Sequence, residues 1–185
     1  MNKIEFKVVI ENYITNTLNF VTEFGGIHPH IAIFADIKDP QDKDEKNQAA
    51  VLHLDMPEEL LQSEEGKETF MTKVFPELAK KVKEKFNVYG VIWISEAWLR
   101  TIDKDEKIPD NYKDLPIKKE VIMINIETIE NTEGRIFELK RHGKQVISDG
   151  DFVDKIELIQ FGDDDPSSIK NVGGRFSGML KQLIN

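Results

Sequence analysis

The 185-residue chain has 39% hydrophobic and 32% charged residues, with the apolar residues in periodic blocks, so we expect one folded domain over residues 1–185. Its formal net charge of −9 argues against a general nucleic-acid binder, which needs a basic surface to displace phosphate counterions. The lack of cysteine excludes disulfides and thiolate sites, and the lack of any apolar run of about 18 residues predicts no transmembrane helix.

Residues 3–24 are predicted to form an amphipathic helix. Apolar side chains recur there at spacings of three and four residues, which places most of them on one face. The pair Gly25-Gly26 follows this stretch, and glycine readily takes the left-handed conformation that ends helices.

Two strands are expected next, over residues 30–37 and 49–56. The polar loop between them, residues 38–48, has a length that favours an antiparallel hairpin. Residues 57–61 then suggest a short helical turn that begins with proline.

A second long helical pattern begins after Ser63, which we expect to cap it, and runs to Phe86. Pro76 lies inside this pattern. Because proline lacks an amide hydrogen and clashes with the preceding turn, we expect it to kink the helix or divide it in two.

Residues 88–99 are predicted to form the central strand, because their middle part is apolar on both faces and therefore needs cover on both sides. A polar loop over 101–116 follows. The later segments predicted from pattern are a strand over 120–129, a turn over 131–134, a strand over 135–141, a turn at 142–143, a segment over 144–148, a strand or helix over 152–161, a loop over 162–174 and a helix over 175–184.

The predicted order is therefore helix, two strands, helix, three or four strands and helix. This order indicates an α+β fold with a mainly antiparallel sheet flanked by helices. Profilin-like and roadblock-type domains have a similar order, an analogy of fold that transfers no function.

The central strand also carries a resemblance. Residues 91–98, Val-Ile-Trp-Ile-Ser-Glu-Ala-Trp, resemble a strand in a loose group of uncharacterised bacterial and phage proteins. In that group, this strand is followed by a second strand that opens with Pro and Glu, then by a Gly turn and a basic strand. The matching positions here are Pro116, Glu120, Gly134 and Arg135, and the segment 174–180 is also similar. The group often has His-Pro where this chain has Leu115-Pro116. The resemblance implies a phage or prokaryotic source and a single domain, but no activity.

Glu96 is the leading candidate for a functional residue. It shares strand parity with Ile92 and Ile94, so it is expected near the edge of the core, where a carboxylate needs a partner. One interpretation is a general base or metal ligand, joined by Asp36 and His53 if the first two strands lie beside it. The other is a structural contact at the strand end, with Arg100 or a backbone amide as the partner.

Trp98 and Arg100 complete the candidate positions. Trp93 and Trp98 have opposite strand parity, so one of them is expected in the core. The other either packs in the core as well or lies at a pocket or subunit interface, together with Arg100.

Two loops carry weaker motifs. The acidic run at residues 163–168 is interpreted as a solvated loop rather than a calcium site, because it lacks the ligand spacing of a calcium-binding loop. The segment 173–175 is interpreted as a turn before a helix rather than an anion site, because it lacks a phosphate-loop spacing.

These observations favour a non-enzymatic binding or protein-interaction domain that self-associates as a homodimer, with no cofactor, no nucleic acid and no membrane among its partners; a protein partner is a further option. A small hydrolase centred on Glu96, in which a metal could take part, is the alternative. The acids within the first apolar stretch do not suit a signal peptide, so a cytoplasmic location is expected.

Overall fold

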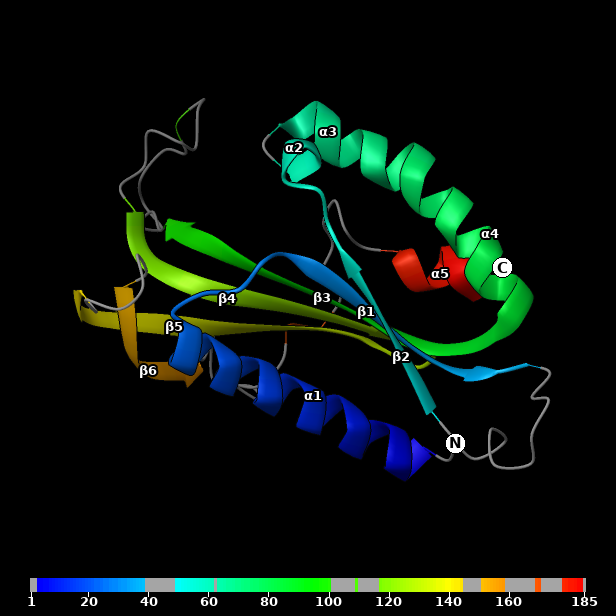
Figure 1. Cartoon of the computed structure of the whole chain (residues 1–185), viewed down its shortest axis with the longest axis horizontal. Helices are drawn as coiled ribbons and strands as arrows, with labels where there is room; N and C mark the ends of the chain where they lie inside the picture. Colours follow the sequence, from blue (N-terminus) through cyan, green and yellow to red (C-terminus); the bar gives the residue numbers. More distant parts are fainter. Residues whose placement is uncertain are drawn as a thin grey trace.

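A computed structural model describes residues 3–38, 49–61, 63–100, 109, 117–144, 151–158, 169–170 and 178–184. Within these residues, six strands form one open antiparallel sheet in the order β2-β1-β3-β4-β5-β6, and the short β7 pairs with β5 (Figure 1). Helices flank the sheet, so the predicted α+β class is confirmed. No helix in the described ranges has the length and apolarity needed to span a membrane.

The strands are β1 (His30–Ile37), β2 (Ala49–Asp55), β3 (Phe86–Arg100), β4 (Ile117–Thr128), β5 (Thr132–Lys144), β6 (Asp151–Leu158) and β7 (Ile169–Lys170). The helices are α1 (Lys3–Phe24), α2 (Glu58–Leu61), α3 (Glu64–Thr69), the π-helical segment η2 (Phe70–Val74), α4 (Phe75–Lys85) and α5 (Met179–Ile184). The predicted bounds of the first helix and the first strand agree with α1 and β1.

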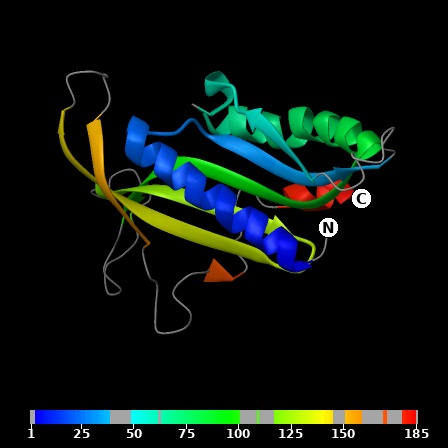
Figure 2. The same cartoon turned by 60° about the horizontal axis from the view of Figure 1, so that its bottom comes forward.

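The sheet has a core on each face. Helix α1 covers one face and helices α2 to α5 lie on the other (Figure 2). Alternation along β1 sends Ala32 and Phe34 into the α1 core and Ile31 and Ile33 into the opposite core, all of them nearly inaccessible to solvent. The same alternation along β3 supplies both cores, which explains why its middle is apolar on both faces, as predicted for the central strand.

The helix boundaries follow the predicted signals. Gly25 has a φ of 82° and donates its amide hydrogen to the carbonyl oxygen of Val21 at 2.8 Å, which ends α1. The hydroxyl oxygen of Ser63 accepts the amide hydrogen of Gly66 at 3.0 Å and caps α3.

Pro76 does not divide the second helical stretch, because the backbone keeps helical torsions from α3 through η2 into α4. Its missing amide hydrogen falls in the first turn of α4. The π-helical turn η2 immediately precedes α4, and a widened turn of this kind is one of the known ways in which a helix absorbs an irregularity.

The hairpin between β4 and β5 differs from the prediction. The turn lies at residues 129–131, and β5 already begins at Thr132. Thr128 holds this earlier turn, because its amide donates to the carbonyl oxygen of Asn131 at 2.8 Å and its hydroxyl oxygen accepts the amide of Asn131 at 3.0 Å. Gly134, expected in the turn, pairs with Asn125 inside the sheet.

A second turn predicted at residues 142–143 is also wrong. Strand β5 continues through these residues to Lys144, because its backbone remains paired with β6 on either side of an irregularity between Arg141 and Lys144. Residues 151–158 form strand β6, so the helical alternative for this segment is wrong. The predicted loops over 101–116 and 162–174 lie mostly outside the described residues.

Glu127 attaches the C-terminal helix to the sheet. Its side chain is only 4% exposed on β4, and its carboxylate accepts the amide hydrogens of Gly178 at 2.6 Å and Leu180 at 2.8 Å. These amides lie at the start of α5, where backbone N–H groups lack helical acceptors. Because Met179 and Leu183 of α5 are buried in the second core, this carboxylate fixes a helix that closes that core.

Replacing Glu127 with alanine is therefore expected to lower the free energy of unfolding by about 2–4 kcal/mol, since the amides of Gly178 and Leu180 would lose a charged acceptor. Glu127→Gln, which retains one acceptor oxygen, should lose roughly half as much. Urea unfolding measures both. The exposed Glu84 on α4 provides the control, because its alanine variant should change stability by less than about 0.5 kcal/mol. Equal losses in Glu127→Ala and Glu84→Ala would contradict this role.

Candidate functional site

The structure does not bring Asp36, His53 and Glu96 together. All three lie on the α1 side of the sheet, but His53 pairs with Ala32 and Asp36 pairs with Asn87. Asn87 is nine residues from Glu96 along β3, a distance of about 30 Å at the rise of an extended strand. By the same measure, His53 is about 13 Å from both Asp36 and Glu96 along the strand direction.

Glu96 contacts the loop that joins α1 to β1. Its Oε1 accepts the amide hydrogen of Ile27 at 2.7 Å. A side chain at Gly26 would meet the same carboxylate, since its Cβ would lie 2.8 Å from Glu96 Oε1. Of the two predicted roles for Glu96, the structural contact with a backbone amide is thus present in the structure.

Asp36 has a different partner at the far end of β1. The hydroxyl group of Tyr89 donates a short hydrogen bond to Asp36 Oδ2. This hydrogen bond, together with burial, raises the pKa of Tyr89 to about 12, so the phenol stays protonated at neutral pH.

His53 belongs to a polar cluster with Tyr13 and His30 that sequence reasoning did not find. The hydroxyl group of Tyr13 lies 2.9 Å from His30 Nε2 and 3.3 Å from His53 Nδ1. The two imidazole rings stack with centroids 5.8 Å apart. Tyr13 is a regular member of the apolar face of α1, and the one signal for its second role was that a buried tyrosine hydroxyl needs a partner.

The hydrogen bonds of this cluster have a defined direction. His30 Nδ1 lies 2.9 Å from the carbonyl oxygen of His28, which can only accept, so Nδ1 carries the proton. In the neutral ring Nε2 is then an acceptor, and Tyr13 donates to it. The oxygen of Tyr13 in turn accepts from His53 Nδ1. Protonation of His30 would reverse this chain, because Nε2 would become a donor.

Burial sets the protonation states of the cluster. Desolvation of the His30 ring lowers its pKa, and the nearby His53 adds to this effect, while the carbonyl of His28 and the charge of Asp55 oppose it. Burial also raises the pKa of the Tyr13 hydroxyl. His30 and the Tyr13 hydroxyl are therefore neutral at neutral pH, and the His30 ring resists protonation on mild acidification.

In the ranges that the structure describes, no group of three or more histidine, aspartate or glutamate side chains is arranged to hold a metal ion. The acidic run at 163–168 and the segment 173–175 lie outside those ranges.

The two tryptophans have different environments. Trp93 is 7% exposed in the core on the α5 side, whereas Trp98 is 58% exposed near the end of β3. The prediction that one of them is in the core is confirmed, and the alternative in which both are buried is wrong. The side chain of Arg100 lies outside the described part of the structure.

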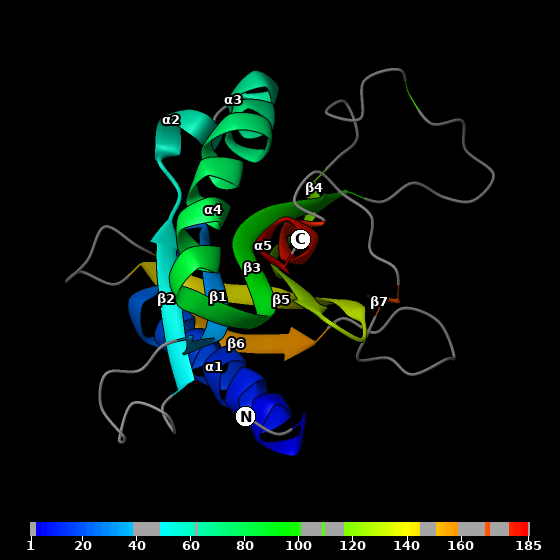
Figure 3. The same ribbon diagram turned by 90° about the vertical axis from the view of Figure 1, so that its right-hand side faces the viewer.

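The outer edge of β2 is the surface most suited to an interaction. Among the described strands, β2 pairs with β1 alone, and it forms one border of the sheet (Figure 3). Its seven residues, Ala-Ala-Val-Leu-His-Leu-Asp, contain no proline, lysine or glycine, and their pairing with β1 has no irregularity. Such an edge presents alternate backbone N–H and C=O groups for pairing with another strand.

Comparison with protein-family models, with curated proteins and with solved structures finds no match to this chain.

The lowered pKa of His30 predicts a pH dependence of stability. The unfolded chain binds a proton near pH 6.5 and the folded chain only at lower pH, so the unfolded state carries more protons in that interval. The free energy of unfolding should therefore fall as the pH drops below about 6.5.

Urea unfolding at about pH 7.5 and pH 5.5 measures this loss. His30→Gln, whose amide can still accept from Tyr13, should reduce it. His28→Gln changes an exposed side chain two residues away, and this variant should lose as much stability between the two pH values as the wild type does. An unchanged loss in His30→Gln would show that other groups cause the pH dependence.

Proposed function

We propose that this chain is a non-enzymatic protein-interaction domain that forms a homodimer through the outer edge of β2. The observation that supports this is the seven-residue edge, which is regular, largely uncharged and not paired with any further strand among the described residues. Monomeric proteins commonly protect such an edge with proline, lysine, a bulge or a short strand, and β2 has none of these features.

The sequence of β2 is compatible with pairing to a second copy of itself. In an antiparallel two-fold arrangement centred on Leu52, all seven residues find a partner. Leu52 lies opposite Leu52 of the second copy, Ala50 opposite Leu54, and Val51 opposite His53. The face that carries Ala50, Leu52 and Leu54 is entirely apolar, so the pairs on this face extend the second core across the dimer.

Charge is also consistent with this arrangement. Two copies that each carry a net charge of −9 repel one another, so a contact between them requires a surface nearly free of acidic groups. Asp55 is the one acidic residue of β2, and in the proposed pairing it lies opposite Ala49 at the end of the strand. No like charges therefore face each other across the contact.

The positions of the other candidate residues favour a binding domain over a hydrolase. A hydrolase centred on Glu96 needs a second polar group within reach of the reacting atoms. Asp36 and His53 lie far from Glu96 along the strands and have partners of their own in Tyr89 and Tyr13. A cytoplasmic location, consistent with the acidic and cysteine-free composition, is part of the proposal.

Leu52→Lys tests the dimer directly, because it would place two ammonium groups opposite each other at the centre of the contact. We expect the dimer dissociation constant to rise by at least about tenfold, which corresponds to about 1.4 kcal/mol. Sedimentation equilibrium measures it. Leu52→Met keeps an apolar side chain of similar volume and should leave the dimer intact.

The charge control is Val8→Lys, which adds the same charge to an exposed position of α1 that is 53% accessible. It should dimerise as the wild type does, and far-UV circular dichroism should show that all variants are folded. A monomeric wild type would refute the proposal, as would a dimer that is equally stable in Leu52→Lys and Val8→Lys.

A further inference from the structure

A pocket lies between the first half of α1 and the turn that joins β4 to β5, separate from the β2 edge. Its volume is about 370 Å³, in the lower part of the range of about 300–1,000 Å³ that is typical of small-molecule sites. Its apolar and aromatic lining residues are Phe6, Ile10, Tyr89, Ile126 and Ile129. A pocket of this size and character is suited to a single ring system rather than to an extended chain.

Packing holds the two aromatic rings of the pocket in place. The ring of Phe6 lies so close to the backbone of Gly90 that a Cβ there would be 2.6 Å from Phe6 Cζ. Phe6 also makes an edge contact with the buried Phe34, with centroids 6.0 Å apart, and its ring centroid lies 6.1 Å from that of Tyr89. Tyr89 is fixed by its hydrogen bond to Asp36. These rings therefore form a preorganised aromatic wall.

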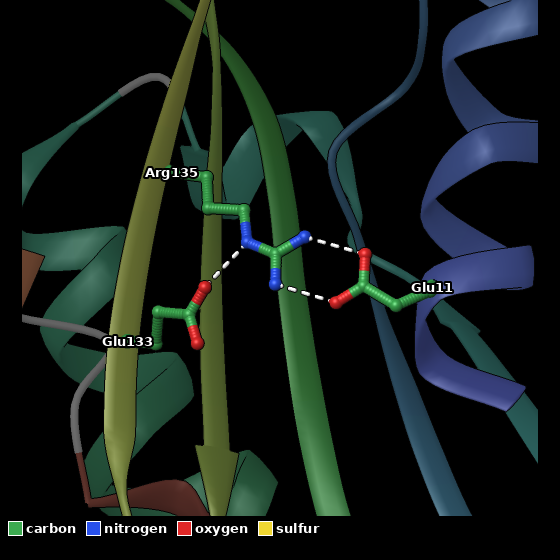
Figure 4. A network of polar contacts seen from close by, with 3 residues as sticks. All are labelled: Glu11, Glu133 and Arg135. Carbon is green, nitrogen blue, oxygen red and sulfur yellow. Dashed lines mark hydrogen bonds and ion pairs between the residues drawn. The ribbon is translucent and has the colours of Figure 1, made fainter. Parts of the chain in front are cut away.

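Arg135, Glu11 and Glu133 are among the polar residues that line the pocket. Figure 4 shows the contacts between these three side chains. The Nη1 and Nη2 atoms of Arg135 donate to the two carboxylate oxygens of Glu11 at 2.8 and 2.6 Å, and its Nε donates to Glu133 Oε1. Glu133 and Arg135 are two residues apart on β5 and so share a face, whereas Glu11 comes from α1.

The contact between Arg135 and Glu11 stabilises the charged forms of both groups. The bidentate hydrogen bond to Glu11 raises the pKa of Arg135, and the same contact lowers the pKa of Glu11. Two carboxylates therefore share one guanidinium group, which leaves one excess negative charge in the network. In the described part of the chain, Glu133 Oε2 has no hydrogen-bond donor, so it can accept one from a ligand.

The formal charges of all the lining residues also sum to a negative value. Lys7 and Arg135 contribute two positive charges, and Glu11, Glu130 and Glu133 contribute three negative charges, which gives a net charge of −1. The chain as a whole carries −9, and a field of this sign attracts cations toward a concave site. Aromatic rings add a further preference for cations, because the face of each ring is electronegative.

We infer that this pocket binds a small aromatic amine in its protonated form. The ring of the ligand packs against Phe6 and Tyr89, and its ammonium group donates to the carboxylate of Glu133. An aromatic carboxylate of the same size is disfavoured, because the guanidinium group of Arg135 is already occupied by Glu11 and Glu133. The inference rests on the pocket alone and does not depend on dimer formation through β2.

Tryptamine and 3-indolepropionate are suitable probes, because they carry the same ring and differ in the sign of the terminal charge. Isothermal titration calorimetry of the full chain should show one tryptamine site with a dissociation constant below about 1 mM. 3-Indolepropionate should bind at least about tenfold more weakly. Absence of tryptamine binding, or equal binding of the two probes, would overturn the inference.

Glu133→Gln locates the ammonium group, since it removes one charge while Arg135 keeps its bidentate contact with Glu11. Tryptamine affinity should fall by about tenfold or more, the effect expected for loss of one charged hydrogen bond, while the weak binding of 3-indolepropionate should not fall. Glu77→Gln on the exposed surface of α4 changes the net charge equally and should leave both affinities unchanged. Equal effects of the two variants would show that tryptamine responds to overall charge and would refute the site.

Discussion

Burial of the sheet on both faces is the constraint on which the rest of the structure depends. Helix α1 covers one face and α2 to α5 lie on the other, so the inner strands β1 and β3 contribute apolar side chains in both directions. The buried middle of such a strand has no position at which a charged side chain is solvated. Charged and hydrogen-bonding side chains therefore lie at the strand ends, on the outer strands and on the helix that faces them.

Three carboxylates at or near the ends of the strands make structural hydrogen bonds. Glu96 binds the loop before β1, Glu127 binds the start of α5, and Asp36 accepts from Tyr89. Carboxylates in such contacts hold loops and helices on an apolar sheet. The two surfaces to which we assign partners, the outer edge of β2 and the pocket beside Arg135, lie at different positions on the molecule.

Local patterns predicted much of the fold. The periodicity of residues 3–24 and the apolar run at 30–37 gave the bounds of α1 and β1, because each of these segments buries a regular face. The hairpin after β4 was misplaced because the residues that commonly form turns, Asn131 and Gly134, lie at the end of the observed turn and beyond it. Which of them turn is decided by the hydrogen bonds of Thr128 and by sheet register rather than by composition.

The polar contacts could be predicted only in part. Strand parity correctly placed one of the two tryptophans in the core, but it left open that both are buried and so did not predict that Trp98 is exposed. It also placed Glu96 near a core edge. It could not provide partners, since Glu11 and Arg135 are 124 residues apart and meet only through the packing of α1 on β5. The cluster of Tyr13, His30 and His53 likewise draws on three elements whose relative positions are fixed by tertiary packing.

The central functional claim concerns the backbone of β2, and amide hydrogen exchange at increasing protein concentration tests it most directly. In a dimer joined at this edge, the outward-facing amides of Ala49–Asp55 should become protected as concentration rises, while amides within β3 keep the same exchange rates. Outward-facing β2 amides that exchange at a rate independent of concentration, in a sample that sedimentation shows to be dimeric, would place the interface elsewhere and contradict the account.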